Sequence, residues 1–404
     1  MVPNGWSNTT IDDNISFSGG AQPPRSVFAF EPQEGFIRLI QIRDYKTDKF
    51  ATYIPKDLAR KLCTADDVMI GRYGPPIFQI LRGLEGAYNV ALIKAIPKEG
   101  VDKEFMYYSL KRNDLFRLID SHSQRTSGQT GIEMDALKAF PMPLPPLPEQ
   151  QKIAKILTTW DKAIDSTERL IDNSKKQKKA LMQQLLTGKK RLLDNKGKRF
   201  EGEWELKKVS DYFDVSSSKR VLQEDWKDEG VPFYRTRELV SLAKNEPFRS
   251  SIYIAEDYYE ELITKYGMPD EGDFLVSGVG TLGIIYQVRE NDKFYFKDGN
   301  VLWFKKEKEV SSDFFKYCFL SDYIQNQINI QASVTTVGTY TITNAKKTRF
   351  HCPPLAEQQK IATVLTNADK EIELLEQQLA DLQQEKKALM QVLLTGKVRV
   401  LVDG

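Results

Sequence analysis

The sequence predicts an α+β protein in which two mixed globular domains are joined by two long helices. These helices are expected to pair as an antiparallel coiled coil with pseudo-twofold symmetry. Three observations predict this fold: a segment that occurs twice, a heptad pattern that runs through each copy, and a strand-rich stretch before each copy. At 404 residues the chain is too long for one ordinary domain and suits two or three.

The repeated segment reads PPLPEQQKIAKILTTWDKAI at 145–164 and PPLAEQQKIATVLTNADKEI at 353–372. The offset of 208 positions (353 − 145) holds without a gap through 145–191 and 353–399, and it aligns two nearly identical stretches, KKALMQQLLTGK and KKALMQVLLTGK. The chain therefore carries two copies of one structural element.

Apolar residues advance through each copy by alternating steps of four and three, which is a heptad seam. Lys178 and Lys386 interrupt the two seams at the same place and are expected to fix the register of pairing. The predicted seam consists of Ile153, Leu157, Trp160, Ile164, Ile171, Leu181 and Leu185 in the first copy and Ile361, Leu365, Ile372, Leu375, Leu379, Leu382, Leu389 and Leu393 in the second.

Both helices have recognisable ends. Pro148 or Pro354 is expected just before the start, and a TGK stop follows at Gly188 or Gly396. Each helix should span about 40 residues, or roughly 60 Å at 1.5 Å per residue. The alternative is two unrelated amphipathic helices on separate cores, but nearly identical seams of equal length favour helices that pair with each other.

The segments before the repeats contain short β-like runs separated by Gly, Pro and Asp. They are FIRLIQI, DVMIGRY and VALIKAI in the first half and DFLVSGV, IIYQV and NVLWF in the second. Each half also ends in a helical stretch, EFMYYSLKRNDLFRLI or DFFKYCFLSDYIQNQI, and shares ordered anchors: NGW with GEW, and YNVALI with GNVLWF. The predicted boundaries are 1–144 for the first domain, 145–191 for the first conserved helix, 192–352 for a linker and the second domain, and 353–404 for the second conserved helix and the C-terminal tail.

Antiparallel helices would hold two divergent domains at opposite ends of a rigid spacer. That arrangement suits the reading of two different short elements at a fixed separation, and DNA is the obvious object. The formal charge of +2 favours no partner overall, so a nucleic-acid surface must be local.

Composition and motifs argue against other classes of protein. We expect a cytoplasmic protein, because there is neither a signal-like start nor a run of about 18 apolar residues. Three cysteines without CxxC spacing and two distant histidines, His122 and His351, predict no metal site. No (N/D)PP(Y/F) methyltransferase motif and no GxxxxGK[ST] loop occur. GVGTLG matches GxGxxG, but a strand follows it, so a hairpin turn is expected.

Base reading requires forked donors, amides and hydroxyls on loops that reach a groove, while Lys, Arg and main-chain N–H groups hold the backbone. IRD after GFIRLIQ and YRTRE after GVPF stand at corresponding places, as do two Ser/Thr/Gly tracts before the helices. Any single side chain among these could be an ordinary solvated group, and the tracts could be flexible loops. The first-domain candidates are Arg25, Arg43, Lys46, Arg72, Tyr73, Gln124, Arg125, Thr126, Ser127 and Gln129. The second-domain candidates are Lys219, Arg220, Arg235, Arg237, Ser277, Thr281, Thr335, Thr336, Thr339 and Tyr340.

The paired PPLPEQQKIA…LLTGKKRL and PPLAEQQKIA…LLTGKVRV segments, each after a variable domain of about 150 residues, resemble the specificity (S) subunit of type I restriction-modification enzymes, an antiviral defence system. The resemblance covers essentially the whole chain. It implies that each variable domain is a target recognition domain for one half of a split DNA sequence, and that the coiled coil sets the gap. It also implies docking of two methyltransferase (M) subunits, with restriction (R) subunits joining through the M2S1 core.

The same resemblance implies that adenine N6 is methylated from S-adenosylmethionine on M, and that ATP and Mg act on R, with no cofactor and no catalytic residue in this chain. The predicted function is therefore a non-catalytic DNA-specificity subunit. Three alternatives stay open: a hidden enzyme domain, a coiled-coil adaptor whose end domains bind proteins, and the specificity subunit of a methylation-only system.

Overall fold

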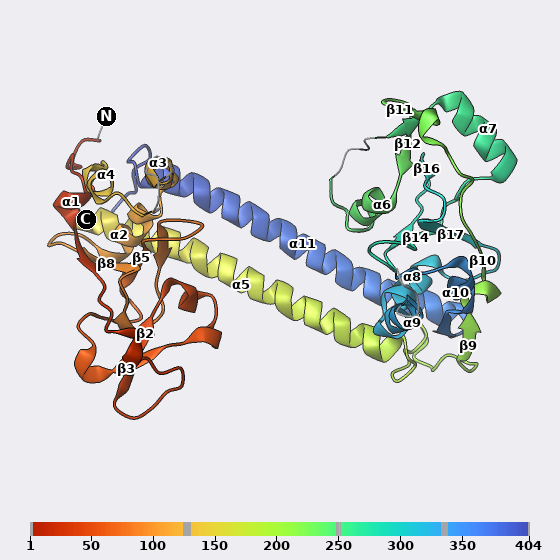
Figure 1. Ribbon diagram of the computed structural model, residues 1–404, viewed down its shortest axis with the longest axis horizontal. Helices are drawn as coiled ribbons and strands as arrows, with labels where there is room; N and C mark the ends of the chain where they lie inside the picture. Colours follow the sequence, from red (N-terminus) through yellow and green to blue (C-terminus); the bar gives the residue numbers. More distant parts are fainter. Residues whose placement is uncertain (1–2, 124–130, 248–249, 251, 333–337, 403–404) are drawn as a thin grey trace. The chain divides into compact units, whose positions relative to one another are not determined.

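The computed structural model describes residues 3–123, 131–247, 250, 252–332 and 338–402. By its internal contacts the chain divides into two compact units. Unit 1 comprises Met1–Glu168 and Gln377–Gly404, and unit 2 comprises Arg169–Glu376. Each unit therefore contains part of both long helices, α5 (Leu147–Leu185) and α11 (Leu355–Leu393) (Figure 1).

The two long helices have the same length, 39 residues each. They begin directly after Pro146 and Pro354, so the predicted start is right for α11, whereas Pro148 lies inside the first turn of α5. A proline is tolerated there because the first-turn N–H groups have no partner within the helix. After each helix a glycine adopts the left-handed conformation, with φ of 70° at Gly188 and 71° at Gly396, which confirms the predicted stops.

The helices pair antiparallel within each unit. In unit 1, Ile153 and Leu157 from the start of α5 lie in one apolar core with Leu389 and Leu393 from the end of α11. Unit 2 repeats this pairing with the start of α11 and the end of α5. Every residue of the predicted seam is buried or partly buried. The predicted antiparallel coiled coil is therefore confirmed.

Both seam lysines form ion pairs across the coiled coil. Lys386 on α11 pairs with Asp161 on α5, and Lys178 on α5 pairs with Asp369 on α11. Each lysine thus meets an acid on the opposite helix, which satisfies its charge where the apolar seam is interrupted. A slip in register would separate both pairs, so they favour one register.

A second charged cluster anchors the segments that flank the helices. In unit 1, Glu149 in the first turn of α5 is buried and accepts a hydrogen bond of 3.0 Å from the Trp6 indole N–H. The Arg399 guanidinium donates two further bonds of 2.7 Å to the same carboxylate. The start and the end of the described chain are therefore both fastened to α5. The equivalent residues of unit 2 are Glu357, Trp204 and Arg191.

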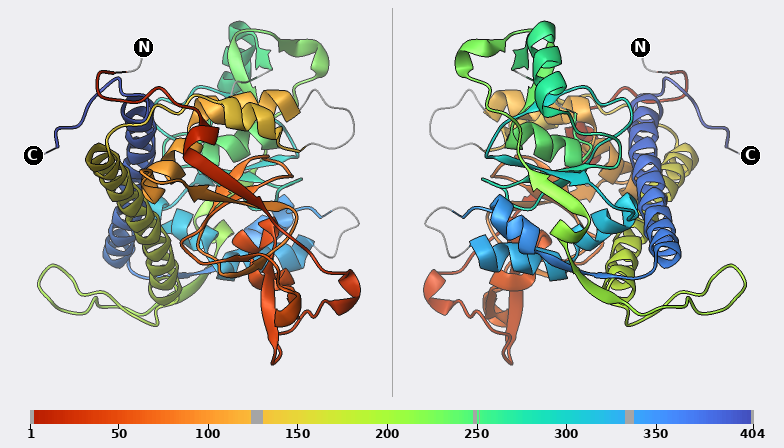
Figure 2. Two further views of the ribbon diagram at one scale, coloured as in Figure 1. Left: turned by 90° about the vertical axis from the view of Figure 1, so that its left-hand side faces the viewer. Right: turned by 90° about the vertical axis from the view of Figure 1, so that its right-hand side faces the viewer.

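Unit 1 is built on two four-stranded sheets, with strand orders β1-β8-β5-β6 and β3-β2-β7-β4. The first sheet is antiparallel throughout, whereas β2 and β7 of the second run parallel. Helices α2 and α3 pack on the first sheet, beside the first turns of α5 (Figure 2, left). The bounds are β1 Ile15–Gly19, β2 Phe36–Ile40, β3 Tyr53–Pro55, β4 Leu62–Cys63, β5 Val68–Gly71, β6 Gln79–Leu81, β7 Gly86–Tyr88, β8 Leu92–Pro97, α1 Ile11–Asn14, α2 Lys103–Leu110, α3 Asn113–Ser123 and α4 Met134–Ala139.

Unit 2 repeats this plan. Its two four-stranded sheets have the orders β10-β17-β14-β15 and β11-β13-β12-β16, again with one parallel pair, β12 and β16. Figure 2 (right) shows this unit facing the viewer. A short two-stranded ribbon joins β9 to β18. The bounds are β9 Glu205–Lys208, β10 Phe213–Ser216, β11 Trp226–Lys227, β12 Val231–Tyr234, β13 Tyr253–Ile254, β14 Phe274–Ser277, β15 Ile285–Gln287, β16 Tyr295–Phe296, β17 Val301–Lys306, β18 Arg349–Cys352, α6 Thr236–Ala243, α7 Glu256–Tyr266, α8 Ser312–Leu320, α9 Asp322–Ala332 and α10 Ile342–Lys347.

All six quoted β-like runs contain a strand: β2, β5, β8, β14, β15 and β17. GVGTLG is the turn between the antiparallel strands β14 and β15, as predicted. Each predicted helical stretch is instead two helices, because the first helix ends at Leu110 or at Leu320 and a second helix begins shortly after it. The anchor YNVALI with GNVLWF is out of register by two residues: Leu92 pairs with the last residue of β5 and Val301 with the last residue of β14. No described helix is long and apolar enough to cross a membrane.

Candidate nucleic-acid interface

In unit 1 the loops that carry the predicted DNA contacts meet at one end of the two sheets. The Gly20 N–H donates to the Leu92 carbonyl at 3.0 Å, and the Arg72 N–H donates to the Ala91 carbonyl at 2.8 Å. The Asn89 N–H donates to the end of β2. These backbone bonds fasten together the segments 20–25, 41–46, 72–76 and 89–91, which we name edge 1.

Unit 2 forms the same arrangement from different residues. The Gly278 N–H donates to the Asn300 carbonyl at 2.8 Å, the Lys297 N–H donates to the Tyr234 carbonyl at 2.8 Å, and the Tyr340 N–H donates to the Gly278 carbonyl at 2.9 Å. These bonds, together with those that the Ser217 hydroxyl makes with the Gly299 N–H and the Val301 carbonyl, join the segments 217–220, 235–238, 278–283, 297–300 and 338–340, which we name edge 2. The two units therefore present corresponding loops with unlike side chains.

The predicted correspondence between IRD and YRTRE holds in the structure. β2 and β12 are each parallel to a neighbouring strand, and each is followed at once by a helical turn. In edge 1 the Asp44 carboxylate is buried and accepts a bond of 2.9 Å from the Gln41 N–H. Burial raises the pKa of Asp44, and the positive charges of Arg38 and Arg43 only partly offset this. One Asp44 oxygen has no hydrogen-bond partner among the described residues.

Glu238 occupies the corresponding place in edge 2 but has more donors. Burial alone would raise its pKa, yet hydrogen bonds from the Arg235 guanidinium and backbone N–H groups bring the pKa below the usual value. Arg237 also donates to the Glu238 carboxylate, at 3.1 Å, while its own side chain is 73 % exposed. This carboxylate therefore holds two guanidinium groups at the rim of edge 2.

Cations of edge 1 lie beside aromatic rings. The Arg72 guanidinium lies 5.5 Å from the centre of the Tyr73 ring, and the Arg43 guanidinium lies 5.6 Å from that of Phe50. A Cβ placed on Gly131 would lie 3.3 Å from the Tyr73 ring, so the end of the first Ser/Thr/Gly tract reaches this edge. The tract of unit 2 does the same through a bridge between Val279 and Thr339.

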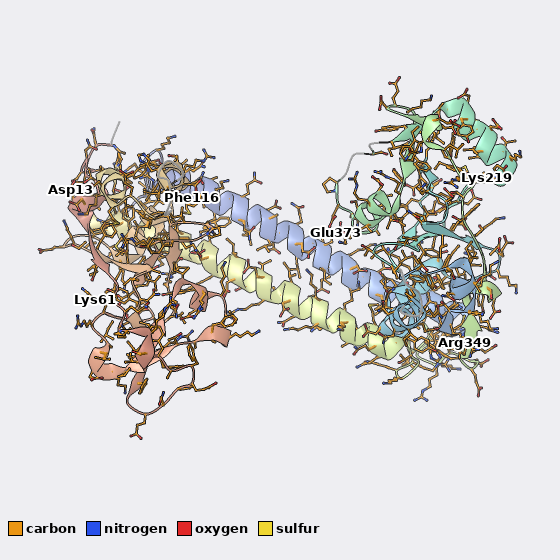
Figure 3. All side chains as sticks on the ribbon, viewed as in Figure 1. Asp13, Lys61, Phe116, Lys219, Arg349 and Glu373 are labelled. Carbon is orange, nitrogen blue, oxygen red and sulfur yellow. The ribbon has the colours of Figure 1, made fainter. Side chains whose placement is uncertain are left out.

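The remaining described candidates are placed as follows. Arg25 and Lys46 are exposed on edge 1. Lys219 (labelled in Figure 3), Arg220 and Thr281 are exposed on edge 2. The Lys219 ammonium lies 5.7 Å from the centre of the Tyr266 ring.

Two predicted DNA contacts lie inside unit 2. Ser277 is fully buried; its hydroxyl donates to the Thr281 carbonyl at 2.5 Å and accepts from the Ile284 N–H. Tyr340 is 1 % exposed, and its hydroxyl is hydrogen-bonded to the Thr348 hydroxyl. The first side chain closes the turn between β14 and β15, and the second packs in the core, so neither presents a group to a ligand. The predicted candidates Gln124, Arg125, Thr126, Ser127, Gln129, Thr335 and Thr336 lie outside the described residues.

Sequence reasoning missed several polar groups of these edges. Asn89 and Asn300 lie in the turns before β8 and β17, and Lys297 directly follows β16. The anchor YNVALI with GNVLWF marks these turns in the sequence but does not indicate which side chains they expose. Phe50, 50 % exposed beneath Arg43 and Lys49, gave no sequence signal.

Within the described ranges, no group of three or more His, Cys, Asp and Glu side chains is placed to hold a metal ion. His122 Nδ1 lies 2.7 Å from the Glu133 carboxylate, and His351 packs on Tyr323. All three cysteines are buried, and burial raises the pKa of Cys318 well above its usual value, so this thiol is a poor nucleophile.

Comparison with known proteins agrees with this two-part plan. A family model for the type I restriction modification DNA specificity domain matches residues 4–175 and 201–384. The type I restriction enzyme MjaVIII specificity subunit of Methanocaldococcus jannaschii is 27 % identical over 99 % of this chain and 94 % of its own length. The putative MjaX specificity subunit of the same organism is 29 % identical over 81 % of this chain and 74 % of its own length.

Solved structures share the fold. The S subunit of a type I restriction-modification system from M. genitalium superposes with a TM-score of 0.57 at 15 % identity, over 97 % of both chains. A structure from a study of complex assembly in a type I system gives a TM-score of 0.61 at 16 % identity, over 98 % of this chain and 100 % of that one. The matches to the family model cover most of the sequence, and the curated relatives are specificity subunits, which are the non-catalytic components of their systems. The chain therefore belongs to the family of type I restriction-modification DNA specificity subunits.

Proposed function

We propose that this chain reads a split, asymmetric DNA target, with edge 1 contacting one half-site and edge 2 the other. The observation that supports this most is that two corresponding sets of sheet-end loops carry different cations and polar groups, each set beside helices of equal length whose ends repeat in sequence. Unlike loops on a common frame suit the reading of unlike sequences.

Each edge supplies both kinds of contact that sequence-specific binding requires. Exposed arginine and lysine side chains, such as Arg25, Lys46 and Lys219, would bind phosphates and make affinity depend on salt. Arg235 and Arg237, which the buried Glu238 carboxylate holds through some of their N–H groups, would contact guanine or phosphate with their remaining donors.

The chain would direct methylation rather than perform it. It would dock two methyltransferase subunits, each of which takes one adenine out of the duplex and methylates N6 from S-adenosylmethionine. Restriction subunits with ATP and Mg would join this M2S1 core. The same reading applies to a methylation-only system, in which the restriction subunits are absent.

The direct test is the pattern of methylated adenines in the source genome, obtained by single-molecule sequencing. We expect one motif with two unlike half-sites separated by an unspecified gap. Substituting residues of edge 1 should change only one half-site, and substituting edge 2 only the other. A continuous motif, or no methylation that depends on this chain, would contradict the proposal.

A second test addresses the coiled coil as a spacer. Inserting seven residues, about two turns or roughly 10 Å, into the middle of both α5 and α11 should lengthen the gap by about three base pairs. Both half-sites should stay unchanged, because neither edge is altered. An unchanged gap with altered half-sites would contradict this role. Salt-dependent DNA binding, alone or with the methyltransferase, distinguishes the proposal from a protein-binding adaptor.

A further inference from the structure

The turns that follow β2 and β12 can be aligned residue by residue, because each strand ends against a parallel neighbour. In unit 1 the last residue of β2, Ile40, pairs with Tyr88 at the end of β7. In unit 2 the last residue of β12, Tyr234, pairs with Phe296 at the end of β16. Ile40 and Tyr234 are therefore equivalent, and so are the residues that follow them.

Hydrogen bonds within the turns give the same alignment. In edge 1 the Asp44 carboxylate accepts a bond of 2.9 Å from the Gln41 N–H, and in edge 2 the Glu238 carboxylate accepts one of 3.1 Å from the Arg235 N–H. Each acid thus reaches back to the first residue after the strand, three positions earlier. Asp44 and Glu238 are equivalent, whereas the residues at the start of the two turns differ.

The position before the acid carries an arginine in both edges. Arg43 precedes Asp44, and Arg237 precedes Glu238. The two arginine side chains are 50 % and 73 % exposed, while the carboxylates beside them are 0 % and 2 % exposed. The edges therefore share an exposed arginine on a buried acid, although the first residue of the turn differs.

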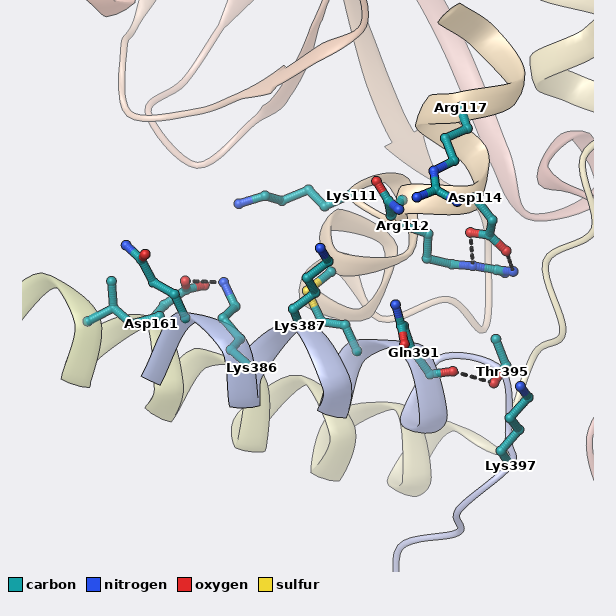
Figure 4. A pocket seen from close by; sticks show the side chains of 14 residues that line it. Lys111, Arg112, Asp114, Arg117, Asp161, Lys386, Lys387, Gln391, Thr395 and Lys397 are labelled. Carbon is teal, nitrogen blue, oxygen red and sulfur yellow. Dashed lines mark hydrogen bonds and ion pairs between the residues drawn. The ribbon is translucent and has the colours of Figure 1, made fainter. Parts of the chain in front are cut away.

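Arginines that stabilise the fold of this chain use all three guanidinium nitrogens. Arg112, which lines the hollow of about 700 Å³ drawn in Figure 4, donates from Nε and Nη2 to Asp114 and from Nη1 to the Pro141 carbonyl. Arg191 and Arg399 follow the same pattern, with Nε and Nη2 on a buried glutamate and Nη1 on a backbone carbonyl. These guanidinium groups have few donors left for a ligand.

The two edge arginines differ from this pattern. Arg237 donates from Nε and Nη2 to one Glu238 oxygen, at 3.3 and 3.1 Å. Arg43 donates from Nη2 to the Phe50 carbonyl at 3.3 Å, and its Nε lies 3.9 Å from an Asp44 oxygen. Within the described part of the chain, that oxygen has no hydrogen-bond partner and Nη1 of neither arginine donates a bond. Because a guanidinium has five N–H donors, each arginine retains donors on Nη1 and Nη2.

This arrangement fits a base edge better than a phosphate. The buried acid offsets the charge of the arginine, and charge is what attracts a phosphate, for which a lysine would serve as well. The acid also restrains the plane of the guanidinium, which matters for a ligand with two acceptors side by side. Guanine presents such a pair, O6 and N7, in the major groove.

We propose that Arg43 and Arg237 are equivalent specificity-determining residues, each of which reads a guanine at the same distance from the methylated adenine of its half-site. Asp44 and Glu238 are the positioning residues that hold them. This rests on the proposed function, which supplies the split DNA target with one methylated adenine in each half-site. The equivalence of the two turns accounts for the equal distances.

The test uses the full chain with its methyltransferase and duplexes in which the motif is randomised one position at a time. The ratio of methylation rates gives the base preference at each position. Arg43→Ala and Arg237→Ala should each lower the preference for guanine at one position about 5- to 150-fold and leave the other half-site unchanged. Arg237→Lys keeps the charge but lacks the paired donors, so it should lose the same preference.

Glu238→Gln tests the positioning role, because it keeps the size of the side chain and removes its charge. We expect a lower guanine preference at the position that Arg237 reads, while overall DNA affinity is kept or increased by the loss of a negative charge. Asp44→Asn should act in the same way on the other half-site. Equal loss of methylation with all four bases would show that the acid is only structural and would contradict its positioning role.

The matched controls are exposed lysines of the same edges, Lys46→Ala and Lys219→Ala. Each should weaken binding to all sequences and reduce the salt dependence of affinity by about one phosphate contact, with base preferences unchanged. Unchanged preferences in both arginine variants, a base other than guanine at the affected position, or unequal distances from the two adenines would overturn the proposal. A wild-type chain that directs no methylation of a split motif would refute the proposed function itself, which is a different result.

Discussion

Replacing Tyr108 by phenylalanine tests how each domain is attached to the coiled coil. The Tyr108 side chain is fully buried on α2, and its hydroxyl lies 2.6 Å from the Asp161 carboxylate and 3.2 Å from the Thr158 hydroxyl, both on α5. Asp161 also pairs with Lys386 of α11. One hydroxyl thus links the domain to a carboxylate shared by both helices. Unit 2 contains the matched set Tyr317, Asp369, Thr366 and Lys178.

The expected loss follows from this geometry. A hydrogen bond to a charged group contributes about 1.5–3 kcal/mol. The Asp161 side chain is 31 % exposed, so water replaces part of the lost bond, and we expect Tyr108→Phe to cost about 1–2 kcal/mol. The substitution keeps the ring and removes one buried oxygen atom, so this cost measures the loss of the hydroxyl and its hydrogen bonds.

The effect should be local, and hydrogen exchange measured by mass spectrometry can locate it. Amides of α2 should exchange about 5–30 times faster in Tyr108→Phe, while those of α8 stay unchanged. Tyr317→Phe should give the reverse pattern. Burial raises the pKa of Asp161, and hydrogen bonds from Lys386 and Tyr108 bring it below the usual value, so Tyr108→Phe should also make unit 1 lose stability at a higher pH on acidification. Unchanged exchange in both helices, or equal changes in both, would refute this reasoning.

Further predictions concern each unit separately. Arg399→Ala removes the partner of Glu149 and should destabilise unit 1, whereas Arg191→Ala removes the partner of Glu357 and should destabilise unit 2. Limited proteolysis should then cleave unit 1 faster in the first variant and unit 2 faster in the second. Because the folded-state pKa of Glu238 is lowered, its charged form stabilises the fold at pH values above the ordinary glutamate pKa of about 4.3, and this stability is lost as the pH falls through the folded-state pKa. Glu238→Gln should therefore lower the free energy of unfolding at pH 7 and make that free energy depend less on acid pH. Gly20→Ala places a Cβ 1.9 Å from a backbone carbonyl oxygen and should cost about 1–3 kcal/mol in urea unfolding, while Gly19→Ala, with nothing within 4 Å, should not.

The candidate site could be predicted from the sequence only in outline. The loops that begin with Gln41 and Arg235 were found because each follows a strand-like run and carries arginines. Burial could not be found in that way. Ser277 and Thr281 both carry a hydroxyl group, so the sequence does not distinguish them. Only the path of the turn between β14 and β15 buries the Ser277 hydroxyl and leaves Thr281 exposed. The ion pair of Arg237 with Glu238 could not be predicted either, because nothing in the sequence distinguishes a buried glutamate from one on the surface.

The sequence by itself determined the features that follow a periodic or repeated pattern. These are the two helices, their seams, their glycine stops and the strands, because heptad and strand spacing are local properties of the chain. The two copies also established that the chain is built twice on one plan. Only the tertiary structure decided which charges meet. Trp6, Glu149 and Arg399 come from distant parts of the sequence and meet only in the folded chain. Such sites depend on packing between segments far apart in the chain, and no local pattern of residues encodes that packing.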